Sequence, residues 1–288
     1  MDYIAIILFQ TAISISNLVL ISAGLAVIFG MMRVINFAHG EFLMLGGYTA
    51  VIATQNGVPL LISCFILAPL LVGLVGLIVE YLVIRHLYGR LLDTMLASWG
   101  VSLILIGLVT VIFGNSVSGI STPFGSLSVG RFSIGLYELF LVLVTLVLVA
   151  SGYLVMRYSR IGLIARATMQ DREMAASLGI NQRAVYRATF VTGAALSGLA
   201  GALIAPIAGV VPTIGASYLA KCFITVISGG PAIIAGTLSA SGLLGGVNVI
   251  MTFLATPVLA EVALLAAAVV LLRILPQGIT SKFFRRSQ

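Results

Sequence analysis

The chain has 288 residues, of which 60% are hydrophobic and 8% are charged, and its net charge is +7. A soluble domain carries roughly 25% charged residues, so the composition excludes that class, and repeated apolar runs indicate a membrane protein with several crossings. The basic residues lie in short connections between these runs, as in cytoplasmic loops, so the positive charge implies no nucleic-acid partner.

The first apolar run, Ile4 to Met32, is long enough to cross a bilayer at ~20 residues per crossing, and Arg33 marks its inner end. The N-terminus lacks the features of a cleaved signal peptide, so we expect the run to be retained. The polar stretch Asn36 to Glu41 is followed by about 13 apolar residues, Phe42 to Thr54, which is short for a crossing. We therefore predict a broken or buried segment here.

Two clear spans follow, Pro59 to Ile84 and Thr94 to Phe113. Arg85 and Arg90 in the connection between them predict that it is cytoplasmic. The next stretch, Gly114 to Arg131, is rich in Gly and Ser, and we predict an outside loop.

A span from Ser133 to Met156 leads into the one long polar stretch, Arg157 to Arg187. Its composition predicts a short helix over Ala165 to Leu178, a turn at Gly179 to Asn181, and a new helix after that. The basic residues of this stretch predict that it is a cytoplasmic loop.

Ala188 to Val210 is the next span. Gly193, Ser197 and Gly201 recur at four-residue spacing, with Gly198 between them, and form a small-xxx-small face. We predict that this face packs closely against another helix.

The segment Ala216 to Ser228 is too short for an easy crossing, carries Lys221, and leads into Gly229 and Gly230. It is therefore predicted to be a second broken segment. Spans from Ala232 to Leu254 and Leu259 to Leu275 follow.

Basic residues after the last span place the C-terminus inside; they are Lys282, Arg285 and Arg286. Together the elements predict an all-α polytopic protein with about nine crossings, or eight and a re-entrant piece, in a single domain over 1–288. By parity the N-terminus lies outside.

Two short, Gly-interrupted segments in opposite halves are the usual sequence sign of a transporter's substrate path. Here they are residues 36–48 and 217–237, and tight helix crossings are the alternative. The candidate path residues are Asn36, His39, Glu41, Gly46, Gly47, Gly229 and Gly230.

His39 and Glu41 invite a catalytic or metal-binding interpretation, but no third ligand or motif completes such a site. We expect Asn36, His39 and Glu41 to form a hydrogen-bonded plug, with direct solute contact as the alternative.

The other acids and the cysteines of the apolar segments have simpler interpretations. Glu80 is predicted to be interfacial, and Glu261 to pair with a basic group of another span or chain. Cys64 and Cys222 show no metal-ligand spacing, so we assign neither a disulfide nor a metal to them.

The polar stretch contains the letters E-M-A-A-S-L-G, in which Glu173, Ala175, Leu178 and Gly179 stand as in the E-A-A-x-x-x-G loop of permeases from ATP-binding-cassette importers. The letters I-N-F-A-H-G-E, A-S-W-G-V-S-L-I-L and G-A-A-L-S-G-L-A-G resemble the permeases for branched-chain amino acids and their relatives for urea and short amides. This resemblance extends over most of the chain.

The resemblance implies a transport subunit of a bacterial-type plasma membrane, with a coupling loop at 157–187 that docks on ATPase subunits. It implies two cytoplasmic ATPases that bind ATP and magnesium, a second permease chain, and an extracytoplasmic solute-binding protein. No phosphate-binding G-x-x-x-x-G-K-[ST] occurs in this chain, so we expect no ATPase activity or cofactor of its own. An ion-coupled carrier or a channel is the alternative function, and the substrate branch stays open.

Overall fold

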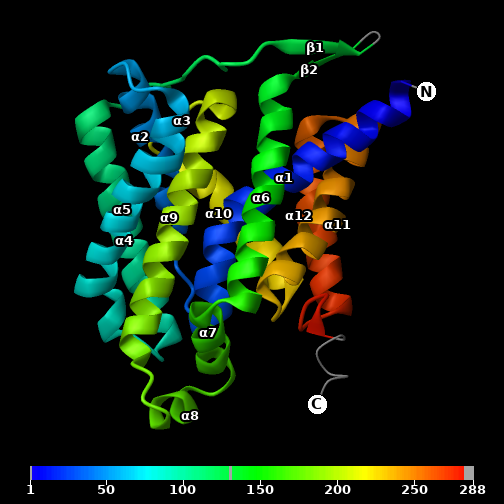
Figure 1. Ribbon diagram of the computed structural model, residues 1–288. Coiled ribbons are helices and arrows are strands. Elements are labelled where there is room, and N and C mark those ends of the chain that lie inside the picture. Colours follow the sequence, from blue (N-terminus) through cyan, green and yellow to red (C-terminus); the bar gives the residue numbers. More distant parts are fainter. Residues whose placement is uncertain (1, 130–131, 282–288) are drawn as a thin grey trace. The chain divides into compact units, whose positions relative to one another are not determined.

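The computed structural model describes residues 2–129 and 132–281. The described chain is almost entirely helical, with one small β-hairpin (Figure 1). Its elements, in chain order, are α1 (Asp2–Met32), α2 (His39–Gln55), α3 (Leu60–Ile62), the π-helix η1 (Ser63–Leu67), α4 (Ala68–Leu82), the 3-10 helix η2 (Ile84–His86), α5 (Leu91–Phe113), β1 (Ser126–Val129), β2 (Phe132–Gly135), α6 (Leu136–Tyr158), α7 (Arg160–Gln170), α8 (Arg172–Ser177), α9 (Gln182–Ala208), α10 (Ile214–Gly229), α11 (Ile233–Leu254) and α12 (Pro257–Ile274).

Within the described ranges, seven helical stretches are long and apolar enough to cross a membrane. One of them, Leu60–His86, runs through α3, η1, α4 and η2. The helices α2 and α10 are shorter, with 17 and 16 residues. The predicted all-α polytopic fold is therefore confirmed, and the two short apolar runs, Phe42 to Thr54 and Ala216 to Ser228, each lie within one continuous helix.

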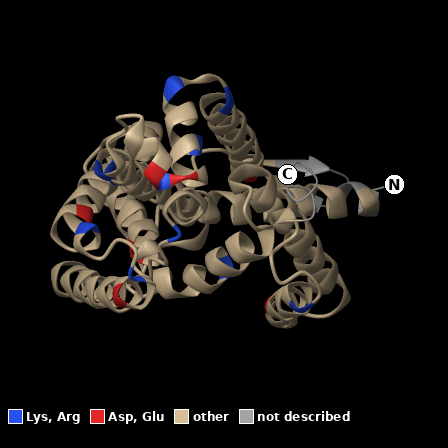
Figure 2. Ribbon diagram, turned by 90° about the horizontal axis from the view of Figure 1, so that it is seen from below, with Lys and Arg blue, Asp and Glu red and all other residues tan. Residues whose placement is uncertain are grey.

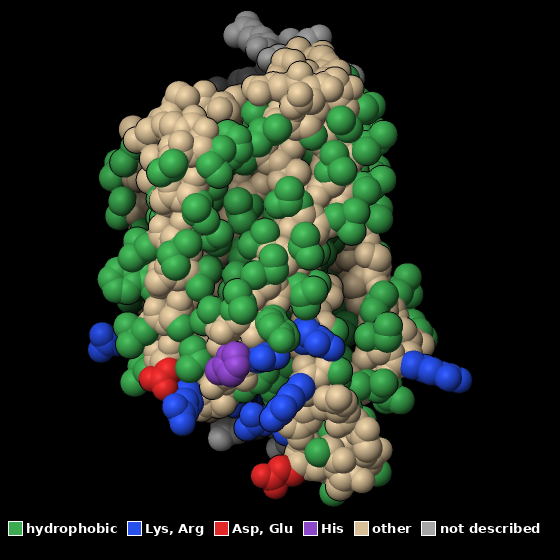
Figure 3. All heavy atoms as spheres, turned by 90° about the vertical axis from the view of Figure 1, so that its left-hand side faces the viewer, with side chains coloured by type: hydrophobic (Ala, Val, Ile, Leu, Met, Phe, Trp, Pro, Cys, Tyr) green, Lys and Arg blue, Asp and Glu red, His purple; other side chains and the backbone are tan. Residues whose placement is uncertain are grey.

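The surface matches a lipid environment. Figure 3 shows hydrophobic side chains over most of one face, with Lys, Arg, Asp, Glu and His side chains near its lower end. Figure 2, which views the chain from the end of Figure 1 that carries α7 and α8, shows that most of the helical ribbon lacks charged residues. Apolar side chains such as Leu96, Ile104 and Leu146 are exposed because hydrocarbon, not water, is the medium they suit.

The chain divides into two compact units built from interleaved segments. Unit 1 comprises the chain up to Ser22, Thr122–Ala150 and the chain from Lys221 onward. Unit 2 comprises Ala23–Ser121 and Ser151–Ala220. The helices α1, α6 and α10 each continue from one unit into the other, so the units are not consecutive domains.

In unit 2, α9 packs against both α2 and α4, and Figure 1 shows these helices side by side. The small-residue face of α9 makes this possible. A Cβ added to Gly201 would lie 1.8 Å from the carbonyl oxygen of Leu43, and one added to Gly193 would lie 2.8 Å from that of Gly24. The predicted packing role of this face is confirmed, because backbone meets backbone there.

The two ends of unit 2 are defined by local contacts. At one end, the ring of Tyr88 packs edge-on against Tyr186 at 5.1 Å, which brings the basic connection before α5 to the start of α9. At the other end, Ser118 and Val210 exchange backbone hydrogen bonds of 2.9 and 2.7 Å. Both α5 and α9 therefore run from the basic end to the end that carries the Gly/Ser-rich loop.

In unit 1, α11 and α12 lie side by side (Figure 1). The end of α10 is fixed by the chain after α12, since Thr280 donates its backbone N–H and its hydroxyl to the carbonyl of Gly229. Gly229 also packs on Gly236 of α11, where an added Cβ would lie 2.5 Å from backbone.

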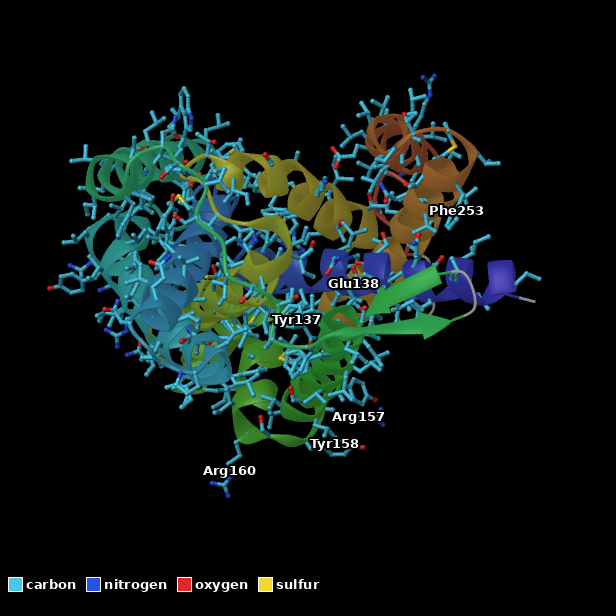
Figure 4. The ribbon with its side chains drawn as sticks, turned by 90° about the horizontal axis from the view of Figure 1, so that it is seen from above. Tyr137, Glu138, Arg157, Tyr158, Arg160 and Phe253 are labelled. Carbon is cyan, nitrogen blue, oxygen red and sulfur yellow. The ribbon has the colours of Figure 1, made fainter. Side chains whose placement is uncertain are left out.

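The stretch from Gly114 to Arg131 was predicted to be a loop, but its last described part forms strand β1, which pairs with β2 in an antiparallel hairpin. Strand β2 occupies residues expected at the start of the next span, so α6 begins at Leu136. Figure 4 shows Tyr137 and Glu138 where this hairpin meets α6. The ring of Tyr137 packs near Phe124 and Phe140, which anchors the hairpin to the helix.

Glu80, predicted to be interfacial because it lies near the end of a span, is covered by the protein and only 2% exposed. The Tyr88 hydroxyl folds back and donates a 2.5 Å hydrogen bond to its carboxylate. Burial, together with this carboxylate, raises the pKa of Tyr88, so the phenol keeps its proton and remains the donor.

We predict that Gly201→Ala lowers the amount of folded protein severalfold, because the new methyl group overlaps the Leu43 carbonyl and separates α2 from α9, at a cost of about 1–3 kcal/mol. The control is Gly107→Ala in α5, where an added Cβ meets no atom of the described chain within 4 Å. The measurement is the yield of monodisperse protein from membranes in mild detergent. Equal yields for the two variants would contradict this packing argument.

Candidate functional site

The predicted break before the second helix is present. Helix α1 ends at Met32, and Arg33 has a φ of 51°, a left-handed backbone that is uncommon for a residue with a side chain. Residues 33–38 are not helical, and α2 begins at His39. The Asn36 side chain accepts a 3.0 Å bond from the N–H of Ala38, so it holds the turn into α2.

This irregular segment lies deep along the neighbouring helix α5. The Phe37 N–H donates a 3.0 Å bond to Ser98, the eighth residue of α5, and Glu41 accepts one from Ser102, the twelfth. At 1.5 Å per residue these serines stand about 10 and 16 Å from the start of α5, which is near the middle of a ~30 Å hydrocarbon core.

The three polar residues at the start of α2 are buried, with exposures of 0% for Asn36, 0% for His39 and 2% for Glu41. Nδ1 of His39 lies 3.1 Å from Oγ of Ser197. Ser197 also donates its hydroxyl hydrogen to the carbonyl of Gly193 at 2.8 Å, so its side chain is held on α9 facing His39.

Glu41 is bound to α5 by a hydrogen bond. Ser102 donates a 3.0 Å hydrogen bond to Oε1 of Glu41. Every residue of the predicted plug is therefore hydrogen bonded, as that interpretation requires. Oε2 of Glu41 and Nδ2 of Asn36 have no hydrogen-bond partner among the described residues, which leaves two polar atoms able to bind water or a solute group.

The first turns of the two short helices meet in unit 2. Gly40 is the second residue of α2 and Gly215 the second of α10, and a Cβ on Gly40 would lie 2.2 Å from the carbonyl oxygen of Gly215. Oε2 of Glu41 lies beside the same glycine. The sequence predicted two related broken segments, residues 36–48 and 217–237. In the structure the first of them contacts Gly215, which lies two residues before the second range.

The four glycines predicted to line a path have different surroundings. Gly46 packs on Gly198 of α9, where an added Cβ would lie 2.0 Å from the carbonyl oxygen. In unit 1, Gly229 packs on Gly236, and Gly230 has a φ of 86° beside Thr280. For these glycines, close helix crossings and a turn account for the absence of a side chain, which was the alternative interpretation.

Gly47 differs from them because it lines a small pocket. The pocket has a volume of about 10 Å³, which is room for no more than one water molecule. Gly201, Val210 and Tyr218 are among its other lining residues. Unit 2 is thus closed to an amino acid at this point.

The predicted coupling helix is two helices. Asp171 breaks the run expected over Ala165 to Leu178, because its backbone is extended (φ −150°, ψ 112°) and its side chain caps α8 by accepting from the N–H groups of Glu173 and Met174. The predicted turn follows. Gly179 adopts a φ of 84°, which a glycine favours, and Asn181 then caps α9.

The surface of α8 also differs from the prediction. Ala175, one of the residues matched to the loop that the resemblance implies docks on ATPase subunits, is 2% exposed and already covered by this chain. Met174 and Leu178 flank it and are 60% and 74% exposed, and Glu173 is also exposed. At the junction of α6 and α7, Figure 4 shows Arg157, Tyr158 and Arg160 pointing outward.

Within the described ranges, no group of three or more His, Cys, Asp or Glu side chains is arranged to hold a metal ion. The two cysteines are free and buried, and Cys64 donates to the carbonyl of Ala202. The site offers hydrogen bonds, close helix contacts and an exposed apolar helix end.

Residues 7–275 match the family described as "Branched-chain amino acid transport system / permease component". The chain belongs to this permease family. Its curated relatives include the high-affinity branched-chain amino acid transport system permease protein LivH of Escherichia coli K12, which is 28% identical over 285 residues, covering 93% of this chain and 92% of the relative. BraD of Pseudomonas aeruginosa is 29% identical and covers 80% of each chain. No solved structure matches the permease significantly.

Sequence reasoning missed several members of the site in this permease. Ser98, Ser102, Gly40 and Gly215 were not singled out, although the two serines stand four residues apart in an apolar span and so share a helix face. That polar stripe was the available signal. The sequence carried no signal for the contact between Gly40 and Gly215, because these residues lie far apart in the chain.

We predict that Glu41→Leu reduces the yield of assembled permease severalfold, because the buried Ser102 hydroxyl loses its acceptor at a cost of about 1–3 kcal/mol. Glu41→Gln keeps an acceptor oxygen and should assemble normally. Asp93→Leu, which changes an exposed carboxylate in the same way, is the control. If the Glu41→Gln variant assembles fully and transports solute, the role of Glu41 is to hold the hydrogen-bonded plug. If this variant assembles but does not transport, Glu41 contacts solute directly.

Proposed function

We propose that this chain is the membrane-embedded subunit of an ATP-driven importer that moves branched-chain amino acids inward across a bacterial-type plasma membrane. The observation that carries the proposal is the family match over residues 7–275, together with relatives whose names state that transport. The buried polar start of α2, with two unpaired polar atoms, supports a path through unit 2.

The partners follow from this role. We assign the chain to a complex with two cytoplasmic ATPase subunits, a second permease chain and an extracytoplasmic solute-binding protein. ATP and magnesium belong to the ATPases, because this sequence has no phosphate-binding loop. Specificity belongs largely to the binding protein, since small apolar surfaces discriminate weakly between similar solutes.

The docking surface that we propose is the exposed end of α8. Met174 and Leu178 present apolar side chains to water, and such residues gain free energy when a partner covers them. Gly179 and Asn181 connect this end directly to α9, whose 27 residues form one helix. A displacement of α8 by a closing ATPase would therefore be passed through α9 to the polar cluster at the start of α2, which consists of Asn36, His39 and Glu41.

Opening the path requires the start of α2 to move relative to α5 and α9. The bonds to be broken include those of His39 to Ser197, of Ser102 to Glu41 and of Phe37 to Ser98, each worth about 0.5–1.5 kcal/mol. Nucleotide-driven rearrangement supplies more than this, and the freed polar atoms then face the solute. This is alternating access with the polar cluster as the closed gate.

The direct test is transport by the purified complex. The chain, its ATPases, its partner permease and its binding protein are placed in proteoliposomes, and uptake of labelled leucine and of labelled urea is compared with and without ATP. We expect ATP-dependent leucine uptake. Uptake of urea alone would assign the chain to the urea and amide branch, and ATP-independent uptake would favour a carrier or a channel.

Coupling is predicted to depend on the exposed apolar pair of α8. Leu178→Asp should leave assembly intact and reduce substrate-stimulated ATP hydrolysis about tenfold or more, because a buried interface position accepts a charge poorly. Leu178→Met, which keeps size and apolarity, is the control. Ala175→Arg should instead impair folding, since Ala175 is buried within the chain. Full stimulation in Leu178→Asp would remove α8 from the interface.

Topology gives a separate prediction. With Cys64 and Cys222 replaced by alanine, a cysteine at Ser177 in α8 should resist an impermeant thiol reagent in intact cells, whereas one at Ser121 should react, because both sites are exposed and lie at opposite ends of unit 2. Permeabilised cells provide the control for reactivity. Labelling at Ser177 from outside would reverse the orientation. The predicted cytoplasmic C-terminus, with Lys282, Arg285 and Arg286, lies outside the described residues.

A further inference from the structure

A close ion pair joins two apolar helices of unit 1, α10 and α12. Nζ of Lys221 in α10 lies 2.6 Å from Oε1 of Glu261 in α12. The Lys221 side chain is 28% exposed and that of Glu261 is 59% exposed. A basic partner for Glu261 was predicted from the sequence, and the structure shows that this partner is Lys221. Neither charge has a role in the function described so far.

The position of the pair is unusual for a membrane protein. Lys221 is the eighth of the 16 residues of α10, so it lies at the middle of that helix, and Glu261 is the fifth residue of α12. Ionised side chains inside a bilayer are costly, and they occur where they face protein or a water-filled cavity rather than lipid. Lys221, at the middle of α10 and 28% exposed, therefore marks a surface that faces protein or water rather than lipid.

The surroundings of the pair are aliphatic. Val258, Val262 and Leu265 stand one turn before, next to and one turn after Glu261 on α12, and they are 74%, 56% and 40% exposed. The surface thus combines one cation, one anion and an apolar wall. A free aliphatic amino acid has the complementary set: an α-carboxylate, an α-ammonium group and an apolar side chain.

We propose that Lys221 and Glu261 form a binding site for the zwitterionic head of an aliphatic amino acid in transit. This rests on the proposed transport of branched-chain amino acids. The ammonium of Lys221 binds the α-carboxylate, the carboxylate of Glu261 binds the α-ammonium group, and the valine and leucine side chains contact the aliphatic part. Without solute the two side chains pair with each other, so no unpaired charge is left at low dielectric in either state.

The competing explanation is a structural ion pair. Removing one member of such a pair harms folding because the other charge is left uncompensated, whereas replacing both by uncharged residues is often neutral or stabilising. With a zwitterion site the doubly neutral protein also assembles well, but it has lost both contacts to solute and transports slowly, whereas a purely structural pair leaves transport unchanged. The double variant Lys221→Met with Glu261→Gln therefore separates the two explanations.

The experiment measures labelled leucine uptake by the reconstituted complex, as a maximal rate per assembled complex at saturating binding protein. We expect the double variant to assemble like the wild type and to transport at least tenfold more slowly, since each lost charge-assisted hydrogen bond is worth about tenfold or more. The apparent KM should change little, because the binding protein sets it. Arg90→Gln with Asp93→Asn removes an exposed pair of 3.8 Å and is the control.

Two results overturn the inference. One is leucine transport by the double variant at nearly the wild-type rate, and the other is a loss of assembled complex that accounts for the whole loss of uptake. Both presuppose that the wild type takes up leucine. Failure of the wild-type complex to transport leucine would instead contradict the proposed function itself, so the two failures are distinguishable.

Discussion

Hydrocarbon offers no hydrogen bonds, so every irregular piece of backbone inside the membrane must be satisfied by the protein. Residues 33–38 impose this demand on unit 2, and Asn36 and Ser98 meet it with hydrogen bonds to backbone N–H groups. The polar residues of apolar spans then have a common explanation. Ser102 and Ser197 occur in α5 and α9 because α2 begins between those helices and brings buried polar side chains with it.

Close helix contact is the second consequence. Gly40 meets Gly215, and Gly201 meets Leu43, at distances that exclude even a methyl group. Such packing leaves about 10 Å³ at Gly47, so solute cannot pass while the helices keep these positions. Transport must then work by displacement of whole helices, and α9, whose 27 residues start at the proposed coupling segment, is about 40 Å long, enough to carry that displacement across the membrane.

The sequence predicted most of the fold because hydrophobic length and basic connections are local properties. It located the long spans, the left-handed turn at Gly179 and the packing face around Gly198. It did not supply the tertiary contacts: Ala175 is covered by its own chain, Glu80 is reached by Tyr88, and Gly46 touches α9. Asp171 also broke a helix that propensity favoured, because its side chain satisfies the first N–H groups of α8.

The chemistry of the polar cluster fits a gate better than a fixed structural element. His39 and Glu41 contact their neighbouring helices through hydrogen bonds to serine hydroxyls, which are neutral groups whose bonds are modest in strength. Serine hydroxyls rotate and both donate and accept, so they can exchange a protein partner for water or a solute group without leaving a buried atom unpaired. The unpaired oxygen of Glu41 and nitrogen of Asn36 then give the first places at which such an exchange can begin. A cluster built from ion pairs would release its members only at a much larger cost, because each separated charge would stand alone at low dielectric.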